Sequence, residues 1–264
     1  MSKAGSHSLL VSPGQELTIR KEAWGPTQTR ILDESRSSDR RFLLVAMDRR
    51  EAGVGLLVGS HLTVLTTVES GASGKQGAGA KEVDMQPYYR KVLEVLKGEW
   101  RHGDHVVLAG PGNTKMAMDN LVRKDPDLAK AASLVEGFDL SGSDGVRALV
   151  KFEGFRKVAG ESVLVEVQEA VEEAVKRISR GERRIAYTLP RVAEAAQAGA
   201  VEKCVVSDDV FSNNVDENEL VRTLNTVEDK GGKVFLCDSS LETGKQVSAL
   251  GGIVALLRYD LHPR

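Results

Sequence analysis

The C-terminal part of the chain decides the fold: it reads GGKVFLC at residues 231–237 and LGGIVALLRY at residues 250–259. Both segments hold a glycine pair followed by an apolar run of the kind found in buried strands. Glycine has no Cβ, so Gly251 and Gly252 permit a backbone reversal that a side chain would obstruct. We therefore predict a strand at 234–237, a short helix, a tight glycine turn and a buried final strand.

The composition limits the class of protein. The 264 residues suffice for one large domain or two of ordinary size. With 36 Lys+Arg against 38 Asp+Glu, a strongly basic nucleic-acid coat is excluded, but local basic patches are not. The sequence has no run of the roughly 20 apolar residues that span a membrane, and no signal-peptide core follows Met1. We expect a soluble, cytoplasmic protein.

The two cysteines, Cys204 and Cys237, each lie in an apolar, strand-like run and form no C-x-x-C motif. The favoured interpretation is buried free thiols in a reducing compartment, with a disulfide or a metal site as the alternative.

The pattern divides the chain into residues 1–40, 41–160 and 161–264. In the first region, alternating apolar positions around Pro13-Gly14 predict a hairpin over 7–20, which is too small to bury a core of its own. In the second, strands are predicted at 42–47, 55–58, 63–68 and 106–109. A helix capped by Asp84 precedes the last of these strands, and another helix begins near Thr114.

The third region alternates helices with strands. Helices are predicted from about residue 162, at 191–198 and at 217–228, and strands at 203–206 and 234–237. The predicted fold class is therefore α/β. It comprises a central mixed-sheet domain and a C-terminal three-layer α/β domain, and the small β segment precedes both.

The strongest candidate loop is Gly110-Pro111-Gly112-Asn113-Thr114-Lys115, which leads from a strand to a helix N-terminus, where backbone N–H groups favour anions. It departs from the dinucleotide motif, whose third glycine would fall at Lys115. A tight structural turn is favoured over a phosphate site, which stays open as the alternative.

Other motifs support no catalytic site. GKQ at 74–76 and at 244–246 lacks both the opening glycine and the Ser/Thr of a P-loop. The sequence His102-Gly103-Asp104-His105 enters a strand, where a solvated polar loop is favoured over a metal site. Asp208-Asp209 and the acidic helix start at 216–219 fit turns and helix caps. No His accompanies a recognisable nucleophile motif, so a hydrolytic triad has no support.

Basic residues are scattered among acidic ones. Solvated helix faces are the default interpretation of these groups, and contact with RNA phosphate is the alternative. The groups are Arg123-Lys124, Arg156-Lys157, Lys176-Arg177 and residues 180–184.

Several segments together resemble the Pelota family, whose relatives are the archaeal and eukaryotic class-1 release factors. The segment GSHSLLVSPGQELTIRKE at 5–22 is similar to the last strands of the family's N-terminal Sm-like domain. Residues 42–47, the loop at 73–75 and VLAGPGNTK at 107–115 are similar to the central domain. AGAVEK at 198–203, VSD at 206–208 and GGIVALLRY at 251–259 are similar to the third domain.

Three departures from the family pattern matter. Release factors need Gly-Gly-Gln in the central domain, whereas the corresponding flexible loop here reads Gly74-Lys75-Gln76, so Pelota is favoured over a peptide-releasing factor. Asn113 stands where the family usually has an aromatic residue. About the first hundred residues of a family member are missing, so we expect an N-terminally truncated form that keeps only a remnant of the Sm-like domain.

The resemblance implies ribosome rescue and mRNA surveillance: recognition of stalled ribosomes and promotion of subunit dissociation without peptide release. It implies as partners the ribosome and its RNA, an elongation-factor-like GTPase and an ABC-type recycling ATPase. The contact loop would be Gly110, Pro111, Gly112, Thr114 and Lys115. We expect a monomer with no catalytic residue and no cofactor bound by a motif.

Two alternatives stay open. The resemblance implies a divalent metal cation for the endoribonuclease activity placed in the family's Sm-like domain. The first alternative is therefore a metal-dependent endoribonuclease, and the second is a peptidyl-tRNA-hydrolysing release factor.

Overall fold

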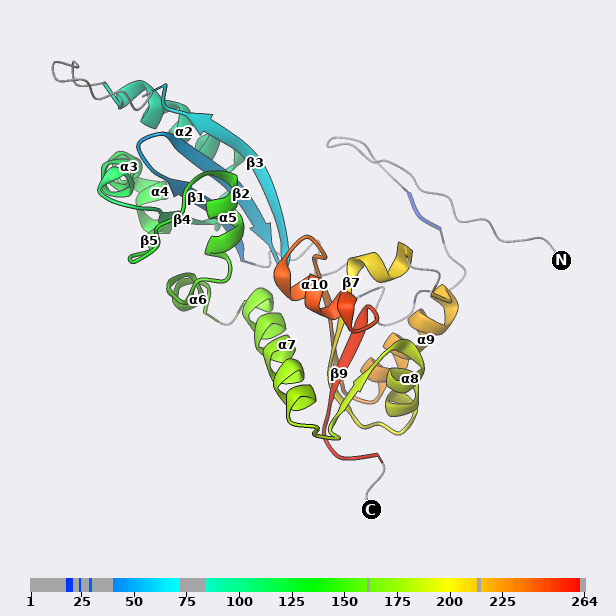
Figure 1. Cartoon of the computed structure of the whole chain (residues 1–264). Coiled ribbons are helices and arrows are strands. Elements are labelled where there is room, and N and C mark those ends of the chain that lie inside the picture. The colour runs from blue at the N-terminus through cyan, green and yellow to red at the C-terminus, as the bar shows by residue number, and fades with distance from the viewer. Residues whose placement is uncertain are drawn as a thin grey trace.

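The computed structural model describes residues 18–20, 24, 29, 40–71, 84–160, 162–212 and 215–261. Two sequence predictions fall outside these residues: the hairpin over 7–20, apart from its last three residues, and the loop Gly74, Lys75, Gln76. Within the described parts, the chain forms two β-sheets with helices packed on both faces (Figure 1).

The first sheet has five strands in the order β3-β2-β1-β4-β5. Strand β1 pairs antiparallel with β2 and parallel with β4, which makes the sheet mixed as predicted. The strands are β1 (Arg41–Met47), β2 (Glu51–Val58), β3 (His61–Glu69), β4 (His105–Ala109) and β5 (Ala132–Leu134).

Helices cover both faces of this sheet, which explains why β1 is apolar from Phe42 to Met47 and buried along that length. One buried cluster joins the sheet to α2 and α3, and another joins it to α5 and α6. The helices of this part are α2 (Gln86–Glu99), α3 (Thr114–Val122), α4 (Pro126–Ala131), α5 (Gly142–Leu149) and α6 (Glu153–Ala159).

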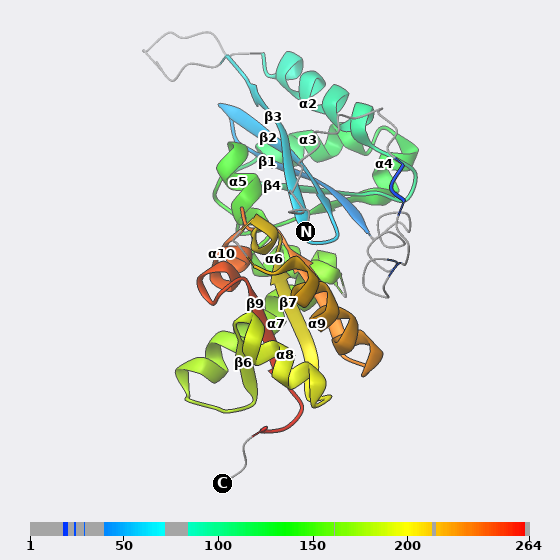
Figure 2. The same cartoon turned by 90° about the vertical axis from the view of Figure 1, so that its right-hand side faces the viewer.

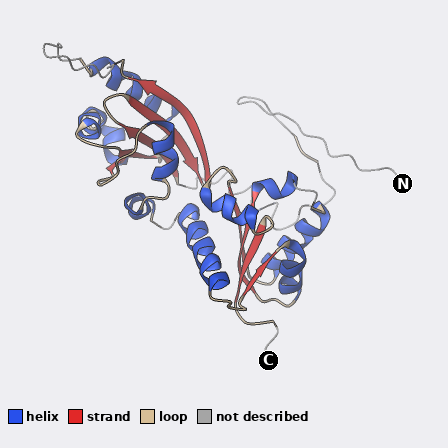
Figure 3. Cartoon of the chain, in the orientation of Figure 1, coloured by secondary structure: helices blue, strands red, loops and turns tan. Residues whose placement is uncertain are grey.

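The second sheet has four strands in the order β6-β9-β7-β8 (Figure 3). Strand β9 lies inside this sheet, between β6 and β7, and all five of its residues are buried. The strands are β6 (Ile185–Tyr187), β7 (Val201–Ser207), β8 (Lys233–Cys237) and β9 (Ile253–Leu257).

This second sheet is the middle of three layers. Helices α7 and α10 pack on one face, and α8 and α9 pack on the other. The predicted α/β class and the three-layer C-terminal domain are thus confirmed. The helices are α7 (Val163–Ser179), α8 (Leu189–Gln197), α9 (Glu217–Asp229) and α10 (Glu242–Ala249), and η1 (Asp208–Ser212) is a 3-10 turn.

The glycine turn before β9 is required by geometry. Gly251 and Gly252 have φ angles of 97° and 80°, in the left-handed region. A Cβ on Gly252 would lie 2.7 Å from Cγ2 of Val210. The turn predicted from the sequence is confirmed, and the structure adds its close approach to η1.

The two sheets belong to separate stretches of the chain, residues 41–134 and 185–257, which Figure 2 shows one above the other. Contacts join them. Ser60 Oγ donates to Leu236 O at 2.5 Å, and Leu62 N donates to Asp238 Oδ2 at 3.3 Å. Leu241, just before α10, belongs to the same buried cluster as Phe155 and Leu164. The boundary near residue 160 stays a prediction.

Candidate functional site

The loop at residues 110–113 joins β4 to α3 at the carboxyl end of the parallel pair β1 and β4. In open α/β sheets ligands bind at this edge of the sheet. Gly110 has φ 130°, and a Cβ there would lie 1.9 Å from Met47 O. The glycine is therefore needed for the loop to pass close to the end of β1.

Two residues of the predicted contact loop, Lys115 and Thr114, are buried. Lys115 is only 5% exposed, and its Nζ donates to Gly110 O at 2.7 Å, with Glu136 Oε2 at 3.6 Å. Thr114 is 6% exposed. Pro111, Gly112 and Asn113 keep accessible surface, whereas Gly110, Thr114 and Lys115 are buried.

Next to the loop lies a pocket of about 640 Å³, which we call the loop-110 pocket. The turn between β1 and β2 gives it Arg49 and Arg50, and α2 gives it Met85 and Tyr89. Its full lining is Asp48, Arg49, Arg50, Met85, Tyr89, Pro111, Gly112, Asn113, Thr114 and Ala117.

The electrostatics of the loop-110 pocket favour an anion. The Asp48 carboxylate is hydrogen-bonded within the turn between β1 and β2. Its Oδ1 accepts from the backbone N–H groups of Arg50 and Glu51 at 2.7 and 2.9 Å. Burial raises the pKa of Tyr89, and the charge of Arg49 offsets part of that rise. Helix α3 begins without a side-chain cap and without an acidic residue in its first turn. At the start of α2 the N-cap is Met85, and the predicted cap residue, Asp84, accepts from Gln86 N at 2.9 Å through its Oδ1.

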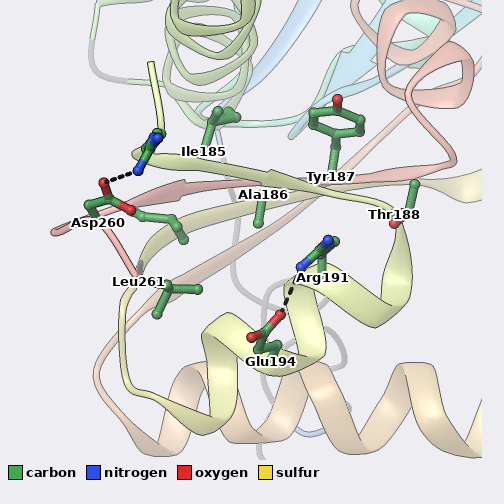
Figure 4. Close-up of a pocket in the computed structure, with 10 residues that line it drawn as sticks. Ile185, Ala186, Tyr187, Thr188, Arg191, Glu194, Asp260 and Leu261 are labelled. Carbon is green, nitrogen blue, oxygen red and sulfur yellow. Dashed lines mark hydrogen bonds and ion pairs between the residues drawn. The ribbon is translucent and has the colours of Figure 1, made fainter. Parts of the chain in front are cut away.

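A second pocket, of about 620 Å³, lies along β6 (Figure 4). Its rim charges are paired: Arg183 Nη1 lies 4.0 Å from Asp260 Oδ2, and Arg191 Nη1 lies 3.3 Å from Glu194 Oε2. Thr188, which also lines it, has φ 68°, in the region that favours glycine. The internal pairing leaves this pocket little net charge to attract a ligand.

Within residues 102–105, His102 and Gly103 are exposed as predicted, but Asp104 is not. Asp104 is only 5% exposed, because its Oδ1 pairs with Arg41 Nε at 2.9 Å and its Oδ2 accepts from Arg101 N at 2.9 Å. His105 stacks on Phe42 with ring centroids 5.2 Å apart. The carboxylate thus fixes the start of β4.

The acidic residues of the C-terminal domain have structural partners. Asp208 Oδ1 accepts from Ser239 N at 2.9 Å, and Asp209 accepts from Ser248 Oγ. Asp216 caps α9 by accepting from the N–H groups of Asn218 and Glu219. These placements agree with the turn and cap interpretation. Within the described ranges, no group of three or more His, Cys, Asp or Glu residues is placed to hold a metal ion.

The cysteines are buried free thiols, as predicted. Burial raises the pKa of Cys204 and of Cys237 to about 12, and nearby carboxylates add to the rise. Since the nucleophile is the thiolate, neither cysteine is activated for chemistry.

Most of the basic residues singled out in the sequence form ion pairs with neighbouring acids; Lys124 has no such pair with any residue that the structure describes. The paired residues are Arg123, Arg156, Lys157, Lys176, Arg177, Arg180, Arg183 and Arg184. Their pairing favours the default interpretation of solvated helix faces.

No helix in the described part of the chain is long and apolar enough to cross a bilayer.

The fold is one that Pelota and release-factor structures also have. A family model described as eRF1 domain 3 matches residues 164–261. The crystal structure of the Thermoplasma acidophilum Pelota protein has a TM-score of 0.62 at 20% identity, over 91% of this chain and 72% of that one. An archaeal translation termination factor, aRF1, also reaches 0.62 at 20% identity, over 88% and 66%. At this identity both comparisons show the fold alone.

Sequence comparison shows the family. The Pelota homolog of Nitrosopumilus maritimus is 31% identical over 256 residues, which cover 97% of this chain and 72% of the relative. The homolog of Cenarchaeum symbiosum is 32% identical over 260 residues, with 97% and 73% covered. The chain belongs to the Pelota family.

Sequence reasoning missed the contribution of Arg49, Arg50 and Tyr89 to the site. The available signal was the charged pair directly after the apolar strand at 42–47, because residues that follow a parallel strand gather at the carboxyl edge of the sheet. The parallel pairing of β1 with β4 was not predicted, so the sequence did not show that this charged pair lies at the same sheet edge as the loop at 110–113.

Proposed function

We propose that this protein is a ribosome-rescue and mRNA-surveillance factor that recognises stalled ribosomes and promotes subunit dissociation without peptide release. The observation that carries the proposal is the match to archaeal Pelota homologs at 31 and 32% identity over 97% of the chain. The shared fold of both α/β domains supports it.

The proposed activity works through binding. The loop-110 pocket offers arginine side chains, a tyrosine and the start of an uncapped helix, which are groups that bind anions. The cysteines are held as thiols, and the acidic pairs stabilise turns. Because the pocket offers groups that bind anions, the ribosome and its RNA are the first partners that we propose. An elongation-factor-like GTPase and an ABC-type ATPase supply nucleotide-driven steps.

The exposed part of the contact loop suits a protein partner. Pro111, Gly112 and Asn113 form its accessible surface, and Met116 on the first turn of α3 is 44% exposed. We assign the apolar part of this surface, Pro111 and Met116, to the GTPase, with Lys115 holding the loop in shape from beneath.

Co-sedimentation with archaeal ribosomes tests the proposal. Ribosomes stalled on a truncated mRNA are expected to pellet the protein more strongly than vacant ribosomes. Addition of the GTPase and the ATPase is expected to release free subunits while peptidyl-tRNA stays intact. A folded protein that fails to pellet with stalled ribosomes even at low salt would exclude the function.

A further inference from the structure

The cations of this chain fall into two groups. Those in the basic clusters evident from the sequence are mostly neutralised by acids, for example Arg180 and Arg184, whose guanidinium groups lie 3.8 and 3.9 Å from carboxylate oxygens of Glu182. Because each ion pair is close to neutral, it attracts an external anion only weakly. The overall formal charge is −2, so attraction to RNA must come from cations without an internal partner.

Arg49 and Arg50 are cations of this second kind. Both side chains are exposed, and neither guanidinium has an ion pair or hydrogen bond with any residue that the structure describes. Their backbone is fixed, because Ser70 Oγ donates to Arg49 O at 2.6 Å and Ser70 N donates to Arg50 O at 2.7 Å. The turn therefore presents two unpaired guanidinium groups from a rigid base.

The surroundings of these arginines suit a phosphate group. Both line the loop-110 pocket, as do Gly112 and Asn113. A Cβ added at Gly112 would meet no atom within 4 Å, so the backbone there is open to a ligand. Arginine binds phosphate through two parallel N–H donors, and the start of α3 adds a weaker attraction.

We propose that Arg49 and Arg50 bind the phosphodiester backbone of RNA, with one phosphate seated in the loop-110 pocket. The inference rests on the proposed function, since it names the surface through which a ribosome-binding protein of negative net charge contacts RNA. The pocket, at about 640 Å³, has room for a phosphate with its sugar, and binding of an acidic peptide instead is an outcome that the test distinguishes. Tyr89 adds an aromatic edge beside Arg49.

The test compares wild-type protein with the variant Arg49→Gln/Arg50→Gln. Binding to a labelled single-stranded RNA is measured by fluorescence anisotropy over a salt series. The variant is expected to bind on the order of tenfold more weakly. Its log–log salt slope is expected to be shallower by about 0.7 for each lost phosphate contact. Its melting temperature is expected to match wild type, because both side chains are exposed.

The variant Arg180→Gln/Arg184→Gln is the matched control, because it removes the same charge from ion-paired positions. It is expected to stay within about twofold of wild type. An equal loss of affinity in both variants would reduce the effect to net charge and overturn the proposal. An unchanged salt slope in Arg49→Gln/Arg50→Gln would also overturn the proposal. Poly-glutamate serves as the acidic-peptide probe, and loss of binding to poly-glutamate without loss of binding to RNA would overturn it too.

Ribosome pelleting separates this inference from the proposed function. Wild-type protein that binds free RNA through Arg49 and Arg50 but ignores stalled ribosomes would refute the function and leave the inference standing. Wild-type protein that pellets with ribosomes as strongly as Arg49→Gln/Arg50→Gln, at every salt concentration, would refute the inference alone.

Discussion

At the scale of single residues, the C-terminal arginine and tyrosine of the family pattern turn out to stabilise helix ends. Arg258 Nη2 donates to Gly231 O at 2.6 Å, and its Nη1 donates to Gly199 O and Lys230 O at 3.2 and 3.3 Å. Tyr259 OH donates to Ala198 O at 2.6 Å. These bonds satisfy carbonyls that follow α8 and α9, where helices leave acceptors unpaired.

Replacement of Arg258 by alanine is therefore expected to lower the free energy of unfolding by about 1–2 kcal/mol. Three carbonyls would turn to water, and one positive charge would leave the negative ends of two helices. Urea titration followed by circular dichroism measures the change. Arg258→Lys keeps the charge but not the planar fork, so an intermediate loss is expected; a loss equal to that of alanine would assign the effect to geometry alone.

The cysteines give a pH dependence. The folded-state pKa of about 12 for Cys204 and Cys237 lies above the ordinary thiol value of 9.0. The folded protein therefore holds its thiol protons to higher pH than the unfolded chain does. This contribution to stability is complete below about pH 9 and is lost as pH rises toward 12.

We expect native protein at pH 8 to react with iodoacetamide far more slowly than urea-unfolded protein, because the thiolate is the reactive form. Mass spectrometry after a timed reaction gives both rates. Fast labelling of the native protein at either cysteine would contradict the burial of that thiol.

At the scale of elements, the sequence predicted long periodic or strongly apolar segments and missed short ones. Helix α9 runs over 217–229 where 217–228 was predicted, and β9 lies in the predicted final strand. Strand β6 has three residues and exists through its pairing with β9, from Ile185 opposite Leu256 to Tyr187 opposite Val254. Neither its length nor its apolar pattern predicts a strand from the sequence.

Helices α4, α5 and α6, which lie between α3 and α7, were missed for a related reason. α5 has eight residues, begins at Gly142 and contains Gly145, and glycine disfavours helix. Its stability comes from burying Val146 and Leu149 against the first sheet, which is a tertiary contact. The partner of Lys115 was missed for the same reason, since the sequence does not show that the lysine Nζ reaches Gly110 O.

Strand β9 carries a prediction at this scale. Leu256 is 7% exposed in the cluster formed with α7 and α10. Truncation to alanine leaves a cavity there and is expected to cost about 2–5 kcal/mol of unfolding free energy. Lys233→Ala is the control, because its exposed Nζ only pairs with Glu166 at 3.3 Å and such pairs contribute about 0–1 kcal/mol. Thermal melts of equal midpoint for the two variants would show that β9 is not part of the core.

At the scale of the whole molecule, the first sheet and its helices share a buried cluster with two residues of the C-terminal part, Leu164 and Leu241. Leu241, from the segment that leads into α10, packs with Phe155 of α6 and with core residues of the first sheet. Asp238 is 9% exposed and accepts hydrogen bonds from Leu62 N and Ser240 N. Loss of either domain would expose part of the core of the other.

We therefore expect the described domains to unfold in one transition. Trp100 reports on the first domain by fluorescence, and far-ultraviolet circular dichroism reports on both; a Trp24→Phe background removes the other indole. The two curves are expected to coincide in urea. Leu241→Ala is expected to weaken the coupling and separate them, whereas the exposed Lys157→Ala is not. Separate transitions in the wild-type protein would mean that the shared cluster adds little stability.

The family assignment carries the last prediction, at the level of overall activity. Release factors place the glutamine of Gly-Gly-Gln beside the peptidyl-tRNA ester, and two glycines let the backbone approach closely. Here Lys75 occupies the second position, before Gln76. Its long side chain and charge are incompatible with that approach, so hydrolysis of peptidyl-tRNA on a programmed ribosome is expected to stay at background while subunits separate. The variant Lys75→Gly creates Gly-Gly-Gln and tests whether Lys75 alone prevents hydrolysis of peptidyl-tRNA. Peptide release by the unaltered chain at the rate of a true release factor would place it with the termination factors, whose fold it shares.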